Sequence, residues 1–178
     1  MRNCSWTAGA STEHDCDMTS EIDTSPSTTL PPRDAKTVTL NDVYRFVYNW
    51  FTLFEHRVPA AQLAAHLPGG EPFHLVYPGA ELRDVQQFTE WYEQLLANTT
   101  WNFHRLAPLT VELAGDGNYH IDVEINWHGG LTEDSTWDAN RPDRRFHFVV
   151  RQQWQVKVHA GSALDDPFHI VGLVTEMR

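Results

Sequence analysis

Helical and strand-like patterns occupy separate parts of this chain, and their order is the strongest constraint on its fold. Apolar residues recur at helical spacing up to about residue 97, and long runs of alternating apolar and polar residues follow. Helices gathered early and antiparallel strands gathered late predict an α+β domain, in which a curved sheet folds around a helix and leaves a concave face. The expected elements are, in order, helices at 40–55 and 60–67, a short strand at 73–77, a helix at 82–97, and strands at 101–113, 119–128, 146–159 and 168–176.

The expected helices carry apolar stripes. In the first helix, four residues at i, i+4, i+7 and i+11 share one face: Val43, Val47, Trp50 and Phe54. The third helix has a similar stripe at helical spacing: Val85, Phe88, Tyr92 and Leu95. Because large apolar side chains are mostly buried, core packing is the first interpretation of these aromatic residues.

Residues 119–128 alternate regularly between apolar and polar. The polar positions form one face: His120, Asp122, Glu124, Asn126 and His128. The alternation predicts a half-buried antiparallel strand, and the Gly-Asp-Gly-Asn segment at 115–118 predicts a hairpin turn into it. Residues 129–145 read as a long polar loop between two strands, and loops of this length are often functional.

Composition limits the domain organisation and the partners. Residues 1–37 are rich in Ser, Thr, Asp and Pro, which predicts a disordered or loosely attached tail before a domain at 38–178. The net charge of −11 and the absence of a basic stripe argue against nucleic acid and anionic membrane as partners. No run approaches the ~18 apolar residues of a membrane span. No secretory segment is visible, so a cytoplasmic location is the default expectation.

Two groups of possible metal ligands have simpler interpretations. Cys4, His14 and Cys16 lie in the tail, where two free thiols are the simpler interpretation, because no second pair of ligands is spaced for a zinc site. The His120-x-Asp122-x-Glu124 pattern, completed across strands by a further His, is unspecific, and a solvated face or a dimer interface is the better interpretation. Motifs of metalloproteases, serine hydrolases and nucleotide-binding proteins are missing, so the sequence predicts no metal and no cofactor.

Three stretches resemble the nuclear-transport-factor-2-like superfamily, which includes SnoaL-like polyketide cyclases, scytalone dehydratase and ketosteroid isomerase. They are VYRFVYNWFTLFEHRVPAAQLAAHL at 43–67, LRDVQQFTEWYEQLL at 82–96, and FHRLAPLTVEL at 103–113. The resemblance covers residues 40–176. It implies a cystatin-like cone, in which N-terminal helices pack on a strongly curved, mostly antiparallel sheet that encloses a pocket. This scaffold hosts enzymes, transport factors and association domains, so the function must come from the site.

Two catalytic positions of the ketosteroid isomerases differ in this chain. Where those enzymes place a general-base Asp before a Pro, this chain has Tyr77 before Pro78, and a phenol with a pKa of ~10 is a poor base at neutral pH. Where they use a protonated Asp as an oxyanion donor, the stretch RQQW offers Gln152. Both departures argue against steroid-isomerase chemistry.

One position agrees with the resemblance. His104 matches the His that faces the cavity in many SnoaL-like relatives, and an imidazole can act as a general acid or base near neutral pH. Asp122 on the following strand is the nearest candidate for an orienting carboxylate. Strand parity opposes this role, because Val111 and Leu113 are expected to point inward, which places His104 on the outer face. A bulge at Pro108 would reverse that conclusion.

Two hypotheses follow. The first is a SnoaL-like pocket protein that binds a hydrophobic small molecule and acts as a cofactor-independent isomerase, cyclase or dehydratase. In this hypothesis His104 transfers the proton, or Tyr48 and His74 near the mouth of the pocket do so. The expected pocket residues are Trp50, Phe54, Tyr77, Trp91, Trp101, Trp127, Phe148, Gln152 and Trp154. The second hypothesis is a non-enzymatic ligand-binding or dimerisation module, favoured by the scarcity of ionisable residues at inward positions. The resemblance also implies a homodimer formed through the outer face of the sheet.

Overall fold

A computed structural model of the protein describes residues 38–137, 142–159 and 167–178. These residues belong to one compact unit, Pro32–Arg178. The expected tail at 1–37, with Cys4, His14 and Cys16, lies outside the described residues. The described elements are α1 (Leu40–Glu55), α2 (Ala60–Ala64), β1 (His74–Tyr77), β2 (Ala80–Leu82), α3 (Val85–Asn98), β3 (Thr99–Leu106), β4 (Thr110–Leu113), β5 (Tyr119–Leu131), β6 (Arg145–Val158) and β7 (Phe168–Met177).

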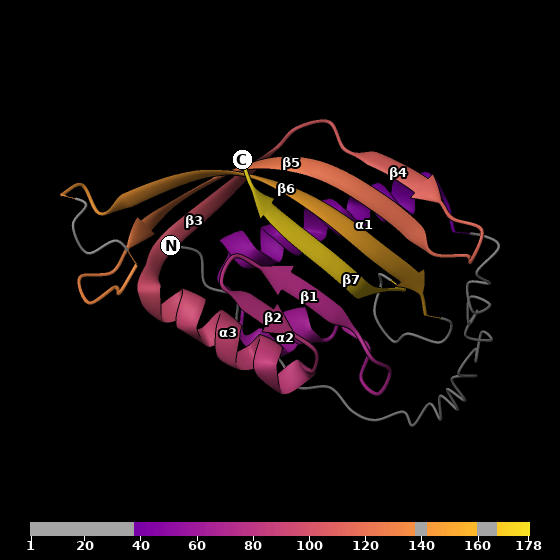
Figure 1. Ribbon diagram of the computed structural model, residues 1–178, viewed down its shortest axis with the longest axis horizontal. Coiled ribbons are helices and arrows are strands. Elements are labelled where there is room, and N and C mark those ends of the chain that lie inside the picture. Colours follow the sequence, from indigo (N-terminus) through magenta and orange to yellow (C-terminus); the bar gives the residue numbers. More distant parts are fainter. Residues whose placement is uncertain (1–37, 138–141, 160–166) are drawn as a thin grey trace, which may run out of the picture. The chain divides into compact units, whose positions relative to one another are not determined.

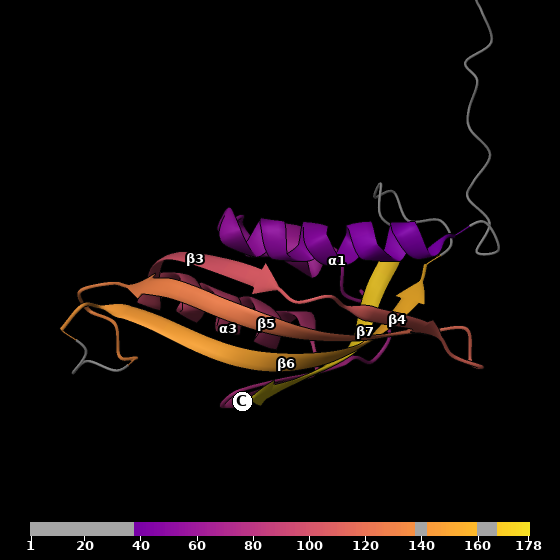
Figure 2. The same cartoon turned by 90° about the horizontal axis from the view of Figure 1, so that it is seen from above.

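The strands form one curved mixed sheet (Figure 1). Its order is β2-β1-β7-β6-β5-β3, and β4 also pairs with β5. The β1–β7 pair is parallel and the other pairs are antiparallel. α1 runs along one face of the sheet, and none of the described helices covers the opposite face of β5 and β6 (Figure 2). The α+β class and the cone-like arrangement predicted from the sequence are confirmed.

The first helix follows directly from its sequence. Thr39 caps its N-terminus in a reciprocal capping box: its side chain accepts from the Asp42 backbone N–H at 3.3 Å, and its own N–H donates to the Asp42 carboxylate at 3.0 Å. The buried face of α1 is the predicted stripe widened by two aromatic rings, and consists of Val43, Phe46, Val47, Trp50, Phe51 and Phe54. The predicted bounds of this helix are confirmed.

The single strand expected at 101–113 is wrong, because the chain breaks into β3 and β4 at residues 107–109. His104 pairs with Trp127, whereas Val111 pairs with Ile121, so the register changes by one residue between the two pairs. Pro108 has no N–H to donate to a ladder, which favours such a break. As a result, His104 and Val111 point to the same, inner face, although in an unbroken strand two residues seven positions apart would point to opposite faces.

The strand β5 extends into the expected loop, because Gly129 and Gly130 remain paired with β6. A Cβ atom at Gly129 would overlap the ring of Phe146, and one at Gly130 would overlap the indole of Trp101. Glycine therefore lets two aromatic rings lie against the strand.

Among the described residues, no helix is long and apolar enough to cross a membrane.

Gly129 gives the first test of this packing. We expect Gly129→Ala to destabilise the protein by about 1–3 kcal/mol, the usual cost of overpacking, because Phe146 is buried and packs edge-on against Trp127 with ring centroids 4.9 Å apart. Chemical unfolding measures this cost. Gly115→Ala is the matched control, since nothing lies within 4 Å of a Cβ atom there, and equal effects of the two substitutions would contradict the packing.

Candidate functional site

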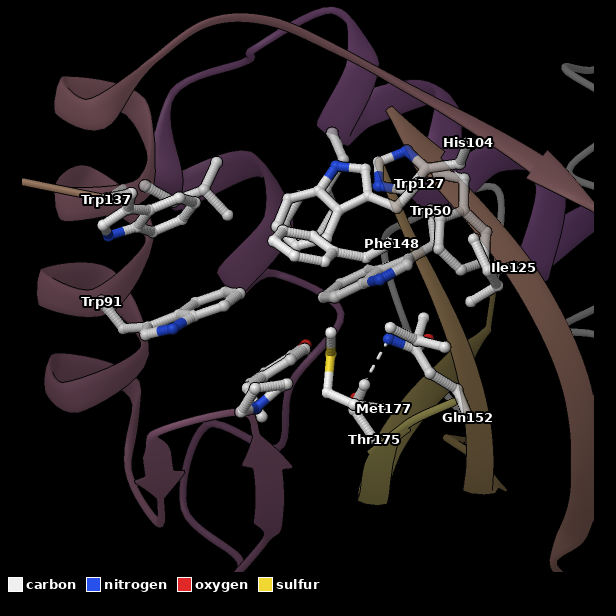
Figure 3. Close-up of a pocket in the computed structure, with 16 residues that line it drawn as sticks. Trp50, Trp91, His104, Ile125, Trp127, Trp137, Phe148, Gln152, Thr175 and Met177 are labelled. Carbon is white, nitrogen blue, oxygen red and sulfur yellow. Dashed lines mark hydrogen bonds between the residues drawn. The ribbon is translucent and has the colours of Figure 1, made fainter. Parts of the chain in front are cut away.

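A cavity of about 330 Å³ lies between the inner face of the sheet and the helices α1 and α3 (Figure 3). The side chains that line it are Trp50, Phe51, Phe54, Tyr77, Pro78, Trp91, Leu95, His104, Ile125, Trp127, Trp137, Phe148, Val150, Gln152, Thr175 and Met177. Aromatic rings make up much of the wall, and the described lining residues include no Asp, Glu, Lys or Arg. Such a wall suits a neutral, largely apolar ligand, because an unpaired charge is costly to bury.

His104 enters the cavity wall from β3. Its ring is stacked on Trp127, the cross-strand neighbour, with centroids 5.8 Å apart and an interplanar angle of 12°. On the helix side it contacts Phe51, with ring centroids 5.0 Å apart. Only 8% of the side chain is exposed. The outer-face position suggested by strand parity is therefore wrong, because the register change beyond β3 turns the side chain inward.

The carboxylate beside His104 comes from Glu55, the last residue of α1. Glu55 Oε1 accepts a hydrogen bond from the His104 backbone N–H at 2.7 Å and lies 3.5 Å from the ring Nδ1. The expectation that Asp122 orients His104 is wrong. Asp122 lies on the opposite face of β5, where it accepts a hydrogen bond from Arg151 Nε at 2.8 Å.

Burial and the charge of the partner shift the pKa values of His104 and Glu55 in opposite directions. Burial lowers the pKa of His104, and the adjacent Glu55 offsets only part of that effect. Burial raises the pKa of Glu55, but the hydrogen bonds and charge of His104 outweigh it, so the pKa lies below its usual value. At neutral pH a neutral imidazole therefore lies beside a carboxylate. The carboxylate favours a proton on Nδ1, which leaves the lone pair of Nε2 free to accept a proton.

Three polar atoms of wall residues are buried without a hydrogen-bond partner among the described residues: His104 Nδ1, whose contact with Glu55 at 3.5 Å is electrostatic, and also Tyr77 Oη and Trp127 Nε1. Burial raises the pKa of the Tyr77 phenol, so it stays protonated at neutral pH and is unsuited to act as a base. The Tyr77 ring is stacked on Trp91 with centroids 4.1 Å apart. The Tyr77 hydroxyl and the Trp127 indole N–H are therefore hydrogen-bond donors in a largely apolar wall.

Gln152 occupies the part of the wall formed by β6 and β7. Its Oε1 accepts from Trp154 Nε1 at 3.0 Å. Its Nε2 donates to Thr175 Oγ1 at 3.1 Å (Figure 3). Trp154 itself is buried in the core, where it packs against Trp50 and Phe51. The sequence predicts Trp154 in the cavity lining, but in the structure it supports Gln152 instead.

The structure gathers most of the predicted site residues around the cavity: Trp50, Phe54, Tyr77, Trp91, His104, Trp127, Phe148 and Gln152. Besides Asp122 and Trp154, three other predicted residues lie outside the cavity lining. Tyr48 is 52% exposed on the far side of α1. His74 points to the other face of the sheet, where its Nε2 lies 2.7 Å from Glu81 Oε1. Trp101 is 44% exposed beside Gly130, because the register of β3 turns it away from His104.

Sequence reasoning missed several lining residues. Ile125 and Val150 share the strand parity of Trp127 and Phe148, so alternation alone could have found them. Glu55 follows Phe54 and lies one turn after Phe51, which places it beside the apolar stripe. Trp137 lies in the segment after β5, where no periodic pattern predicts its position.

The histidines of the described segments were considered as metal ligands. Within residues 38–137, 142–159 and 167–178, no group of three or more His, Cys, Asp or Glu side chains is arranged to hold a metal ion. His128 and His147 stack across β5 and β6 with ring centroids 4.2 Å apart. Asp122, part of the His120-x-Asp122-x-Glu124 pattern, is paired with Arg151.

Solved structures place the fold among known proteins. No protein-family model matches the sequence, and no curated protein matches it. A nuclear transport factor 2 (NTF2-like) superfamily protein from Salmonella enterica matches 77% of this chain and 89% of its own, with a TM-score of 0.61 and 11% identity. Aln2 from a Streptomyces species matches 77% of this chain and 89% of its own, with a TM-score of 0.56 and 11% identity.

A third similar structure is a hexachlorocyclohexane dehydrochlorinase, LinA-type3, from Novosphingobium barchaimii. It matches 78% of this chain and 85% of its own, with a TM-score of 0.59 and 9% identity. At these identities the similarity shows the fold alone. The helices on a curved, open sheet and these structural matches together give this chain the fold of the nuclear-transport-factor-2-like superfamily.

Proposed function

We propose that this protein binds a neutral, largely apolar small molecule in the cavity and moves a proton on it without a cofactor, as an isomerase, cyclase or dehydratase. The observation that carries the proposal is the His104–Glu55 pair. An imidazole in an apolar wall, with a carboxylate behind it and no charged neighbour among the described lining residues, is the arrangement expected of a general base.

The chemistry follows from the protonation states. Nε2 of the neutral imidazole takes a proton from a carbon next to a carbonyl group, and the imidazolium that forms is stabilised by Glu55. That ion pair is stronger in a water-poor cavity than in water. The same imidazolium can return the proton to another atom, which isomerises the substrate, or to a leaving hydroxyl group, which eliminates water.

The fold neighbours support the class of reaction only loosely. One is named a dehydrochlorinase, so this scaffold is able to host an elimination reaction in at least one other protein.

A non-enzymatic ligand-binding module remains the second candidate, because the contact between His104 Nδ1 and Glu55 is long, at 3.5 Å. The two candidates differ in one outcome: a module binds the ligand and leaves its protons in place.

We also propose that the protein forms a homodimer through the outer face of the sheet. Phe103 on β3 is 51% exposed on this face, beside the stacked pair His128 and His147. The acidic side chains there do not simply repel a second copy, since Asp122 is already paired with Arg151. An exposed aromatic side chain in such a setting supports a protein–protein contact.

Removal of the base is the first test. We expect wild-type protein to accelerate the exchange of the acidic protons of 2-tetralone, a bicyclic ketone, in D₂O. We expect His104→Gln to lower that catalysed rate by ~10²–10⁴-fold, the usual contribution of a positioned proton-transfer group. Proton NMR measures the exchange. Tyr48→Phe, on the exposed side of α1, is the matched control and is expected to keep the wild-type rate.

Binding of 2-tetralone without any accelerated exchange would favour the binding module over the enzyme. Unchanged exchange in His104→Gln would assign the proton transfer to another group. Circular dichroism of each variant separates loss of the base from loss of the fold.

The second test uses pH. The neutral imidazole is the active form, so the exchange rate falls as pH drops through the His104 pKa, which burial places below its usual value. Glu55 raises this pKa, so Glu55→Gln lowers it further and shifts the acid limb of the pH–rate profile to lower pH. The rate at neutral pH falls at least ~10-fold, because the imidazolium loses its counter-charge. An acid limb that stays in place or moves to higher pH would contradict the pairing.

The dimer is tested by mass. Light scattering at micromolar concentration is expected to give twice the mass of the chain, and Phe103→Glu is expected to give the monomer mass, because a charge replaces an aromatic ring at the contact. Tyr48→Glu places the same charge on the opposite side, at an equally exposed aromatic residue, and is expected to leave the dimer intact. A monomeric wild-type protein would rule out this interface.

A further inference from the structure

The hydrogen bonds around Gln152 have only one possible direction. An indole N–H can donate but cannot accept, so Trp154 Nε1 must face the carbonyl oxygen of the Gln152 amide, at 3.0 Å. The amide nitrogen therefore faces Thr175 and donates to its hydroxyl oxygen at 3.1 Å. If the amide were turned over, two donors would face each other at the buried Trp154. The orientation of Gln152 is thus fixed by its neighbour.

The direction of these two hydrogen bonds decides whether the Thr175 hydroxyl can donate a hydrogen bond to a ligand. Because its oxygen already accepts from Gln152, its hydroxyl proton is free to donate, and the structure gives that proton no acceptor among the described residues. Thr175 lines the cavity and is partly exposed. Hydrogen bonds that run in one direction polarise one another. The Thr175 hydroxyl, at the end of the series Trp154–Gln152–Thr175, is therefore a better donor than an isolated hydroxyl.

Thr175 and His104 lie at different ends of the cavity. His104 on β3 is opposite Trp127 of β5, whereas Thr175 on β7 lies in the row of Gln152 and Val123. The two positions are three strands apart and four residues apart along β5, on the order of 15–20 Å along the sheet before its curvature is considered. Figure 3 shows the Gln152–Thr175 pair on the side of the view away from His104.

We infer that Thr175 anchors a hydrogen-bond acceptor of the ligand, with Gln152 and Trp154 as positioning residues. The ligand class is an elongated, flat, uncharged molecule with a carbonyl or ether oxygen at the end remote from the proton that His104 takes. The inference rests on the proposed function of the cavity and adds to it the polarity of the ligand. A carboxylate or phosphate does not fit, because the described lining residues hold no Lys or Arg to pair with it.

Two probes of similar shape separate the anchor from the apolar wall. 2-Acetylnaphthalene carries a carbonyl oxygen, and 2-ethylnaphthalene has a methylene group in its place. Titrations of ¹⁵N-labelled full-length protein, followed through the indole N–H resonances, give both dissociation constants. We expect Thr175→Val to weaken binding of the ketone about fivefold, the size of one neutral hydrogen bond, and to leave binding of the hydrocarbon unchanged.

Thr175→Ser keeps the hydroxyl and is expected to keep the wild-type affinity for the ketone. Trp154→Phe removes the donor that fixes Gln152, so it is expected to reduce the preference for the ketone without contacting either probe. If Thr175→Val weakens both probes equally or neither of them, the anchor is overturned while the cavity still binds apolar ligands. If the wild-type protein binds neither probe, the binding proposal itself fails, and the anchor with it.

Discussion

The burial of α1 against the concave face of the sheet is the contact on which the rest of the structure depends. Its apolar face is too large to leave in water, and the sheet curves around it. Trp50 is at the centre of this contact, packed against Trp154 of β6 and Phe88 of α3. The helix fills only part of the concave face. The cavity lies beside its last turns, which supply Trp50, Phe51 and Phe54 to the wall.

Local patterns were enough to predict most of the elements and much of the wall, but not the short strand β2 or the break between β3 and β4. The stripe of α1 and the alternation of β5 are local properties of the sequence, so periodicity found the helix and strand that carry Trp50 and Trp127. Periodicity failed where one residue changes the register. The break at Pro108 separates two paired segments, and only the pairing with β5 shows on which side His104 lies. A tertiary contact decided this position, and local sequence does not encode it.

The partner of His104 was missed for a related reason. Asp122 is closer to His104 in sequence and was the expected carboxylate, yet side chains of neighbouring strands meet only when they share a face. Glu55 is distant from His104 in sequence, but it ends the helix α1, which packs on the same face of the sheet as the His104 side chain. Trp137 was missed for a different reason. It lies after β5 with no periodic neighbours, so its place in the wall depends on how the chain leaves the strand.

The hydrogen bond between Glu55 and the His104 backbone joins the end of α1 to β3. One carboxylate therefore serves two tasks, since it fixes a strand to a helix and lies beside the ring that would carry the proton. The position of Glu55 beside His104 consequently depends on the docking of a single helix. A partly folded chain in which the sheet has formed but α1 has detached would lack the cavity wall and the counter-charge together. Under the proposed function, such a chain would neither bind the ligand nor transfer a proton until α1 has docked.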